Sequence, residues 1–169
     1  MRKLLTLMGV LGLVALTSAI LVVAIVSANG EEKFKLTNLS GDQVPTSVTT
    51  AMIGEMEVEL NEAATEMKFE LEVDKVAAGT TITAAHLHCG DSVTNGPVIV
   101  GIFAGPFLGD GRLAEGVLVD ADLTPAETLC AIDTLSDLAD AMNAGNVYIN
   151  VHTLANSGGE IRGQFPTDP

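Results

Sequence analysis

The sequence contains no tryptophan, one tyrosine and only five phenylalanines among its 169 residues. A carbohydrate-binding surface built from stacked aromatic rings is therefore not expected. The motifs of common hydrolases and nucleotide-binding enzymes are also missing: there is no Gly-x-Ser-x-Gly, no phosphate-binding glycine-rich loop, no Cys-x-x-Cys and no His-Glu-x-x-His. We therefore expect a protein that is not an enzyme and has no catalytic residues. We also expect no cofactor, a metal ion being the one alternative.

Basic residues are scarce. Lys and Arg number eight against 22 Asp and Glu, which gives a formal net charge of −14. Two of the basic residues, Arg2 and Lys3, precede the first acidic one, so residues 30–169 hold six basic and 22 acidic residues, or −16. This charge makes nucleic acid and anionic membrane surfaces poor partners. The expected partner is an unknown extracellular protein or surface component, with membrane contact only through the N-terminal segment.

The N-terminal segment has the pattern of an export signal. Arg2 and Lys3 are followed by an uncharged apolar run, 4–26, and then by Ser27 and Ala28, small residues that suit a cleavage site. At about 1.5 Å per residue in a helix, this run could also span a bilayer of about 30 Å. Residues 1–29 are therefore either a cleaved signal peptide or a signal anchor. In both cases the rest of the chain, 30–169, is expected outside the cell, secreted or attached to the surface.

Cys89 and Cys130 are the only cysteines. An even number of cysteines in an exported domain predicts one disulfide between them. The rival interpretation makes Cys89 a metal ligand beside His88. Alternation along a strand favours the disulfide, because it directs Cys89 to the opposite face from that histidine.

Strands are predicted where apolar and polar residues alternate. Met56, Val58 and Leu60 alternate with glutamates, and 66–73 repeats the pattern after a short loop, so the two runs are expected to form an antiparallel hairpin. Nearly every residue of 98–103 is apolar, which predicts a central strand covered on both faces. The expected strands are 34–39, 54–60, 66–73, 80–89, 98–103, 117–119, 147–153 and 160–165.

Little helix is expected. The segment 124–127 has a capping threonine followed by proline, which predicts one short turn, and 136–143 predicts a second short helix capped by Ser136 and ended at Gly145. Gly105-Pro106 is expected to be a turn. Together these features predict an all-β domain, an antiparallel Greek-key β-sandwich or barrel with one or two short helices. An N-terminal hydrophobic helix is expected to precede it.

The three histidines of the chain lie in two of the expected strands. His86 and His88 are two residues apart, so they share one face of their strand. His152 belongs to the strand 147–153, which the turn 156–159 should pair with the last strand. One polar patch is therefore expected. Its further members are Asn150, Glu160, Arg162 and Gln164.

This patch has two interpretations. In one, it is a hydrogen-bonded polar network in which Glu160 pairs with Arg162 and each histidine contacts an amide or carbonyl. In the other, His86, His88 and His152 converge at about 2 Å on one copper or zinc ion, with partners such as Glu160 orienting the rings. Arg162, a permanent cation, disfavours an ion close by. The network is the expected arrangement and the metal site is the alternative.

The same segments resemble the CHRD domain, named after chordin, a secreted antagonist of bone morphogenetic proteins. The resemblance extends from Phe34 to Phe165, within a domain of residues 30–169. Residues 154–157 depart from the family pattern, which more often has a proline near this hairpin tip. The motifs that match are LSGDQVP at 39–45, AHLH at 85–88, NGPVIV at 95–100, GNVYINVHT at 145–153 and GGEIRGQ at 158–164.

The resemblance implies an exported, non-catalytic binding or structural module of unknown ligand. Growth-factor binding is not implied, because that property of chordin is associated with cysteine-rich modules absent from this sequence. The chain has a looser similarity to the Greek-key fold of Cu/Zn superoxide dismutase, which also places a His-x-His pair on a strand. The further metal-binding histidines of that enzyme have no counterparts among three histidines, so a dismutase is not expected.

Overall fold

The computed structural model describes residues 23–26, 30–124 and 130–165. Within these ranges the chain forms nine strands, one α-helix and two short 3-10 turns. The 3-10 turns are η1 (Gly41–Gln43) and η2 (Asp120–Asp122), and the helix is α1 (Leu135–Asn143). The strands are β1 (Val23–Val26), β2 (Glu32–Leu39), β3 (Ile53–Leu60), β4 (Met67–Asp74), β5 (Ile82–Cys89), β6 (Val98–Phe107), β7 (Gly111–Leu118), β8 (Val147–Thr153) and β9 (Ile161–Gln164).

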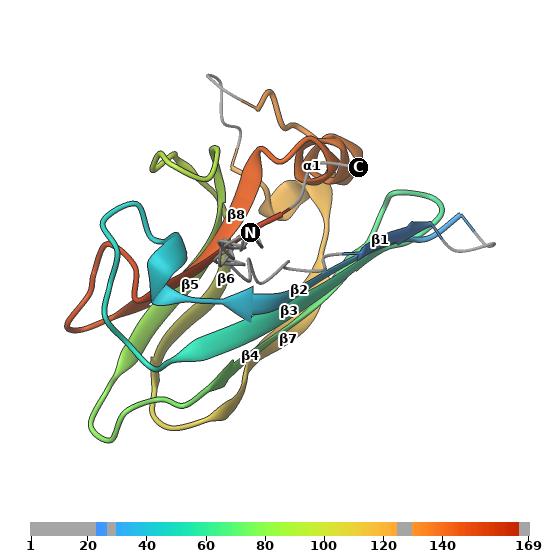
Figure 1. The fold of residues 1–169 in the computed structure, drawn as a ribbon. Helices are drawn as coiled ribbons and strands as arrows, with labels where there is room; N and C mark the ends of the chain where they lie inside the picture. Colours follow the sequence, from blue (N-terminus) through green and yellow to red (C-terminus); the bar gives the residue numbers. More distant parts are fainter. Residues whose placement is uncertain (1–22, 27–29, 125–129, 166–169) are drawn as a thin grey trace, which may run out of the picture.

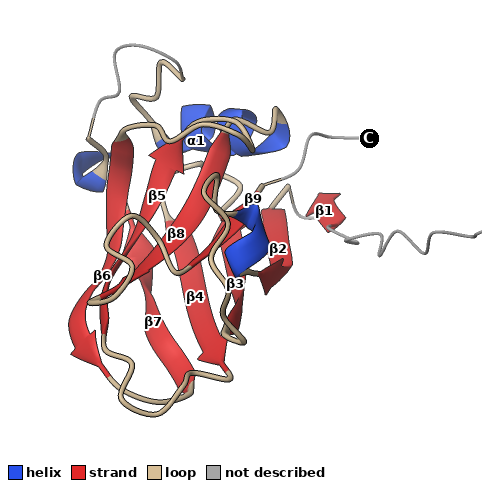
Figure 2. Ribbon diagram, turned by 60° about the vertical axis from the view of Figure 1, so that its left-hand side comes forward, coloured by secondary structure: helices blue, strands red, loops and turns tan. Residues whose placement is uncertain are grey.

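The strands form two antiparallel sheets that pack face to face, with α1 at one end (Figures 1 and 2). One sheet has the order β1-β2-β3-β4-β7 and the other has the order β6-β5-β8-β9. The predicted all-β sandwich is confirmed. The β3–β4 hairpin is also confirmed, with Leu60 opposite Met67. At one edge Ser40 exchanges two backbone hydrogen bonds of 3.0 Å with Arg162, which ties the end of β2 to β9 in the other sheet.

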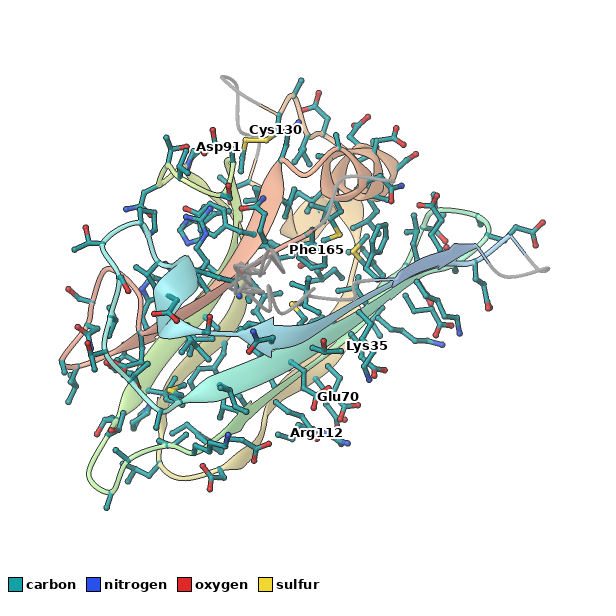
Figure 3. All side chains as sticks on the ribbon, in the orientation of Figure 1. Lys35, Glu70, Asp91, Arg112, Cys130 and Phe165 are labelled. Atoms are coloured by element: carbon teal, nitrogen blue, oxygen red, sulfur yellow. A yellow bond between two sulfur atoms is a disulfide. The ribbon has the colours of Figure 1, made fainter. Side chains whose placement is uncertain are left out.

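The core lies between the sheets and follows the alternation of the sequence. Met56 and Leu71 from one sheet and Leu87 and Ile149 from the other are fully buried. The charged residues of the same strands lie on the outer surface, where Glu70 and Arg112 form an ion pair of 2.7 Å (Figure 3). Burial of the apolar faces stabilises the sandwich by about 25 cal/mol for each Å² of apolar surface removed from water.

Strands β6 and β7 differ from expectation. β6 is an edge strand, not a central one, and it continues through Gly105-Pro106, where a turn was expected. A proline is tolerated there because an edge strand leaves one row of its N–H groups outside the ladder. β7 begins at Gly111 instead of Val117. The strand was not predicted because it contains two glycines and its apolar and polar residues do not alternate regularly.

The helix α1 confirms the helix expected at 136–143 but begins one residue earlier, at Leu135. Its N-cap is Thr134, not Ser136: the Thr134 hydroxyl accepts from the backbone N–H of Asp137, whose carboxylate accepts from the backbone N–H of Thr134. This capping box satisfies two amides that would otherwise lack partners. The chain leaves the helix through Gly145, which has a φ of 74°. Of the short turn expected at 124–127, residues 125–127 lie outside the described residues.

The predicted export segment also falls largely outside the described ranges, because residues 1–22 and 27–29 are not among them. Its described part, Val23–Val26, is the edge strand β1 paired with β2 instead of part of a helix. Among the described residues, no helix has both the length and the apolar character needed to cross a membrane.

Cys89 and Cys130 form the predicted disulfide (Figure 3). Their Cα atoms are 6.0 Å apart and the bond closes a loop with a sequence separation of 41. It links the end of β5 to the segment before α1. The alternative role of Cys89 as a metal ligand is therefore wrong, because its sulfur is bonded to another sulfur and it lies in the core.

Candidate metal centre

The three histidines meet on the outer face of the four-stranded sheet. β5 carries His86 and His88 on the face opposite the buried Leu87, and β8 lies beside β5. The register of the two strands places Asn150 opposite His86 and Tyr148 opposite His88. His152, two residues further along β8, therefore lies diagonally across from His86 on the same face.

One nitrogen from each ring lies within 4.8 Å of the other two. The closest pair is His86 Nδ1 and His152 Nε2, 3.2 Å apart. The ring centroids are 5.1 Å apart for His86 and His152 and 5.8 Å for His86 and His88. Nitrogens that share one tetrahedral zinc or copper ion at 2.0–2.1 Å are about 3.3 Å apart. His86 Nδ1 and His152 Nε2 already have about this spacing, and a nitrogen of His88 lies within 4.8 Å of the ligand nitrogens of the other two rings.

Backbone carbonyls fix the tautomers of two histidines. His88 Nδ1 lies 2.9 Å from the carbonyl oxygen of Gly96, and His152 Nδ1 lies 2.9 Å from that of Ser157. A carbonyl oxygen can only accept, so each Nδ1 carries the proton and each Nε2 keeps its lone pair. In metal sites, a hydrogen bond of this kind to the nitrogen that does not bind the ion orients the ligating histidine.

The free nitrogen of His88 has no partner among the described residues. Its Nε2 is buried without a hydrogen bond, and the whole residue is 9% exposed. His86 Nδ1 faces the lone pair of His152 Nε2, so a proton on His86 bridges the two rings in the metal-free protein. Leaving a buried polar atom unpaired costs about 1–3 kcal/mol. A metal ion would accept the lone pair of His88 and replace the bridging proton.

The surroundings keep these imidazoles neutral. Desolvation lowers the pKa of His88 from 6.5 to about 4. Desolvation also lowers the pKa values of His86 and His152, and for His152 the charge of His86 adds to the effect. Neutral imidazole is the form that binds a metal ion.

Tyr148 separates the histidines from the expected cation. Its ring stacks on His88 with centroids 4.9 Å apart and planes inclined by 7°. The guanidinium carbon of Arg162 lies 3.4 Å from the centroid of the same ring. Because β8 lies between β5 and β9, His88 and Arg162 contact opposite faces of Tyr148. The positive charge is partly compensated by the aromatic face, although it still contributes to lowering the pKa of His88.

The hydrogen-bond partners of Arg162 differ from the expected one, Glu160. Its guanidinium donates to the carbonyl oxygens of Asp91 and Thr94 and to Gln164 Oε1. Gln164 in turn donates to the carbonyls of Gly90, Gly145 and Val147, at 2.8–3.0 Å. The expected ion pair between Glu160 and Arg162 is replaced by these bonds. Both side chains hold the loop after β5, whose Gly96 carbonyl orients His88.

Glu160 and Asn150 hold the hairpin between β8 and β9. The carboxylate of Glu160 accepts from Thr153 Oγ1 at 3.0 Å and from Asn156 Nδ2. Asn150 Nδ2 donates to the carbonyl oxygen of Gly158 at 3.0 Å. The same hairpin presents the Ser157 carbonyl to His152. Each polar residue of the predicted patch therefore supports a loop that orients a histidine.

Several contacts of the centre were not expected from the sequence. Alternation places Tyr148 on one face with Asn150 and His152, but its stacking on His88 was not predicted. The carbonyls of Gly96 and Ser157 carry no such signal, because any residue supplies a backbone oxygen. Gly96 itself is required by packing, since a Cβ there would lie 1.5 Å from the carbonyl oxygen of Cys89.

The fold and centre define an antiparallel β-sandwich with one disulfide and three histidines converging on its outer face. The sequence pattern of the CHRD domain matches residues 36–165, and the chain therefore belongs to the CHRD domain family. No curated protein matches the chain. No solved structure matches it either.

Proposed function

We propose that this protein is an exported CHRD-domain module that binds one transition metal ion, copper or zinc, through His86, His88 and His152. The observation that carries the proposal is the buried Nε2 of His88. It has a lone pair and no hydrogen-bond partner among the described residues, and one nitrogen of its ring lies within 4.8 Å of a nitrogen from each of the other two rings. Three imidazole nitrogens in this arrangement suit zinc and copper.

The polar network predicted from the sequence accounts for one part of the patch but not for the histidines. The structural role of the patch is carried by side-chain hydrogen bonds to the loops beside it. These bonds come from Arg162, Gln164, Asn150 and Glu160. His88 and His152 each contribute one bond to those loops, through Nδ1. His86 Nδ1 and His152 Nε2 face each other at 3.2 Å, and Nε2 of His88 has no hydrogen-bond partner among the described residues. A network without a metal leaves Nε2 of His88 without a partner among the described residues.

The second candidate is a non-catalytic surface module whose histidines are purely structural. It is favoured by the loop-holding bonds of Arg162 and Gln164, which need no metal. In both candidates the protein binds and does not catalyse, and its partner is an extracellular protein or surface component. The two candidates differ in whether the isolated protein takes up a metal ion.

A metal titration separates them. The purified protein, in the mature form that the expressing cell yields, is treated with chelator, dialysed and titrated with Cu²⁺ and Zn²⁺ by calorimetry. We expect one ion per chain with micromolar affinity or better, and a loss of about 100-fold or more in His88→Ala. The matched control is Glu57→Gln, which removes an exposed carboxylate from the outer face of the other sheet and should leave affinity unchanged.

Thermal unfolding gives an independent readout. A ligand that binds only the folded state raises stability by about 2.7 kcal/mol at 100 times its Kd. The wild type should therefore unfold at a higher temperature with metal than without, whereas His88→Ala should not respond. Absence of stoichiometric binding in the wild type would contradict the metal proposal and leave the structural module.

Export is proposed from the basic start and apolar run of residues 1–29, with the disulfide as support, because disulfides are typical of oxidising compartments. N-terminal sequencing of the mature protein tests it. A start near Asn29 means a released protein, and an intact Met1 in the membrane fraction means a surface anchor. A full-length chain in the cytoplasm would contradict export.

A further inference from the structure

We propose that the metal ion keeps one coordination position open to a small exogenous anion, which reaches it across β6 beside Gly101. This inference rests on the proposed metal binding and specifies what the centre does with the ion. Among the described residues, the cluster offers three ligand atoms. Zinc and copper sites with three protein ligands bind a further ligand, usually water or substrate.

Described parts of the chain cover two of the three rings. Tyr148 and the loop held by Arg162 cover His88, and the hairpin that bonds to Nδ1 covers His152. On the β6 side the loop between β5 and β6 reaches His88 through the Gly96 carbonyl, whereas the residue of β6 opposite His86 is a glycine. β6 is the edge strand of this sheet, so no further strand of the sheet lies beyond it.

Gly101 is the feature that opens this side. It lies directly opposite His86 in the β5–β6 register, and it is exposed. Directly opposite residues in an antiparallel pair have Cβ atoms about 4.5–5.5 Å apart, so any side chain at 101 would stand beside the His86 ring. A Cβ built on Gly101 meets no atom within 4 Å. A glycine inside a strand often marks a place where a ligand approaches closely.

The neighbours of Gly101 set the size and charge of the ligand. Val98 lies opposite His88, and Ala104 lies opposite Ala84, so the approach is bordered by small apolar side chains. Among the described residues, the cluster consists of three imidazoles and includes no carboxylate, so the ligands do not compensate the charge of a divalent ion. A compact anion would reduce that charge in a partly desolvated site. The ligand class is therefore a small monoanion such as hydroxide or azide.

Azide is a suitable probe because it adds a charge-transfer band when it coordinates Cu²⁺. The copper-loaded wild type, Gly101→Leu and Gly101→Ala are titrated with azide, and copper affinity is measured separately for each. Leucine fills the space beside His86, whereas alanine adds one methyl group where nothing stands within 4 Å. Both replacements favour strand formation over glycine, so folding should be retained.

The expected result is a saturable azide band in the wild type and in Gly101→Ala, with azide affinity at least about tenfold weaker in Gly101→Leu. Copper affinity should be the same in all three. A wild type that binds copper but gives no azide band would overturn the open position and leave the metal proposal intact. Equal azide affinity in Gly101→Leu and wild type would overturn the route across β6. Absence of copper binding, seen before azide is added, would refute the metal proposal itself.

Discussion

The ring of Tyr148 lies parallel to the imidazole of His88, with an angle of 7° between the planes. Its hydroxyl oxygen accepts from the backbone N–H of Gly96 at 2.9 Å, and the carbonyl of Gly96 accepts from His88 Nδ1 at the same distance. Tyr148 thus stacks on the imidazole of His88 and also binds the loop whose carbonyl fixes the tautomer of that imidazole. This arrangement makes Tyr148 a positioning residue for the proposed metal ligand.

Replacement of Tyr148 should therefore weaken metal binding without removing a ligand. Tyr148→Leu deletes the stack and the hydroxyl, and we expect copper affinity to fall by about 10–100-fold, as when other residues that orient a metal ligand are replaced. Tyr148→Phe keeps the stack and loses only the hydrogen bond, at a cost of about 1 kcal/mol in stability and a smaller loss of affinity. Calorimetric titration and urea unfolding measure both. Wild-type copper affinity in Tyr148→Leu would contradict the positioning role.

Arg162 should be needed for its shape as well as its charge. The residue is 1% exposed, and its planar group lies on Tyr148 while donating to two loop carbonyls. Lysine cannot reproduce this geometry, so Arg162→Lys should destabilise the protein by about 2 kcal/mol in urea unfolding. The control is Arg112→Lys on the exposed face of the other sheet, which should cost less than about 0.5 kcal/mol. Equal stability of the two variants would refute this role.

Alternation in the sequence was sufficient to predict the sandwich, the β3–β4 hairpin and the face shared by His86 and His88. It was misleading for β6, because an apolar run has the same composition in a central strand and in an edge strand whose outer face is lined with Val98 and Gly101. Position within a sheet depends on which strands pair, and that is a long-range property.

The histidine cluster was predicted as a set of residues, but its chemistry was not. A permanent cation beside three imidazoles argued against a metal ion, and only the structure shows Arg162 on the far side of Tyr148. The partners that orient the rings are backbone carbonyls of two loops, at Gly96 and Ser157. Backbone atoms leave no trace in residue identity, so their positions could not be inferred from the sequence.

The metal-free protein should lose stability as the pH falls from about 6.5 to 4. The pKa of His88 is about 4 in the folded state and 6.5 when exposed, so the unfolded chain takes up a proton first as the solution is acidified. The stabilising effect of neutral His88 is complete above pH 6.5 and is lost as the pH falls toward 4. After allowance for solvent screening, we expect a loss of about 2 kcal/mol.

Urea unfolding of the chelator-treated protein at several pH values measures this loss. The variant His88→Gln cannot titrate at this position, so its stability should depend less on pH over the same range. The pKa values of His86 and His152 are also lowered, so part of the dependence should remain in this variant. A wild-type stability that does not change between pH 6.5 and 4 would show that the histidines are not desolvated in solution.

The disulfide should make a large contribution to stability because it closes a long loop. Cys89 and Cys130 are 41 residues apart, and loss of such a cross-link corresponds to about 4 kcal/mol on the chain-entropy view. Cys130→Ser removes the bond and leaves Cys89 as a small apolar residue in the core, so its unfolding midpoint in urea should fall accordingly. A thiol assay on denatured, unreduced wild type should find no free thiol. Two titratable thiols, or equal midpoints for the variant and the wild type, would show that the bond does not form in the mature protein.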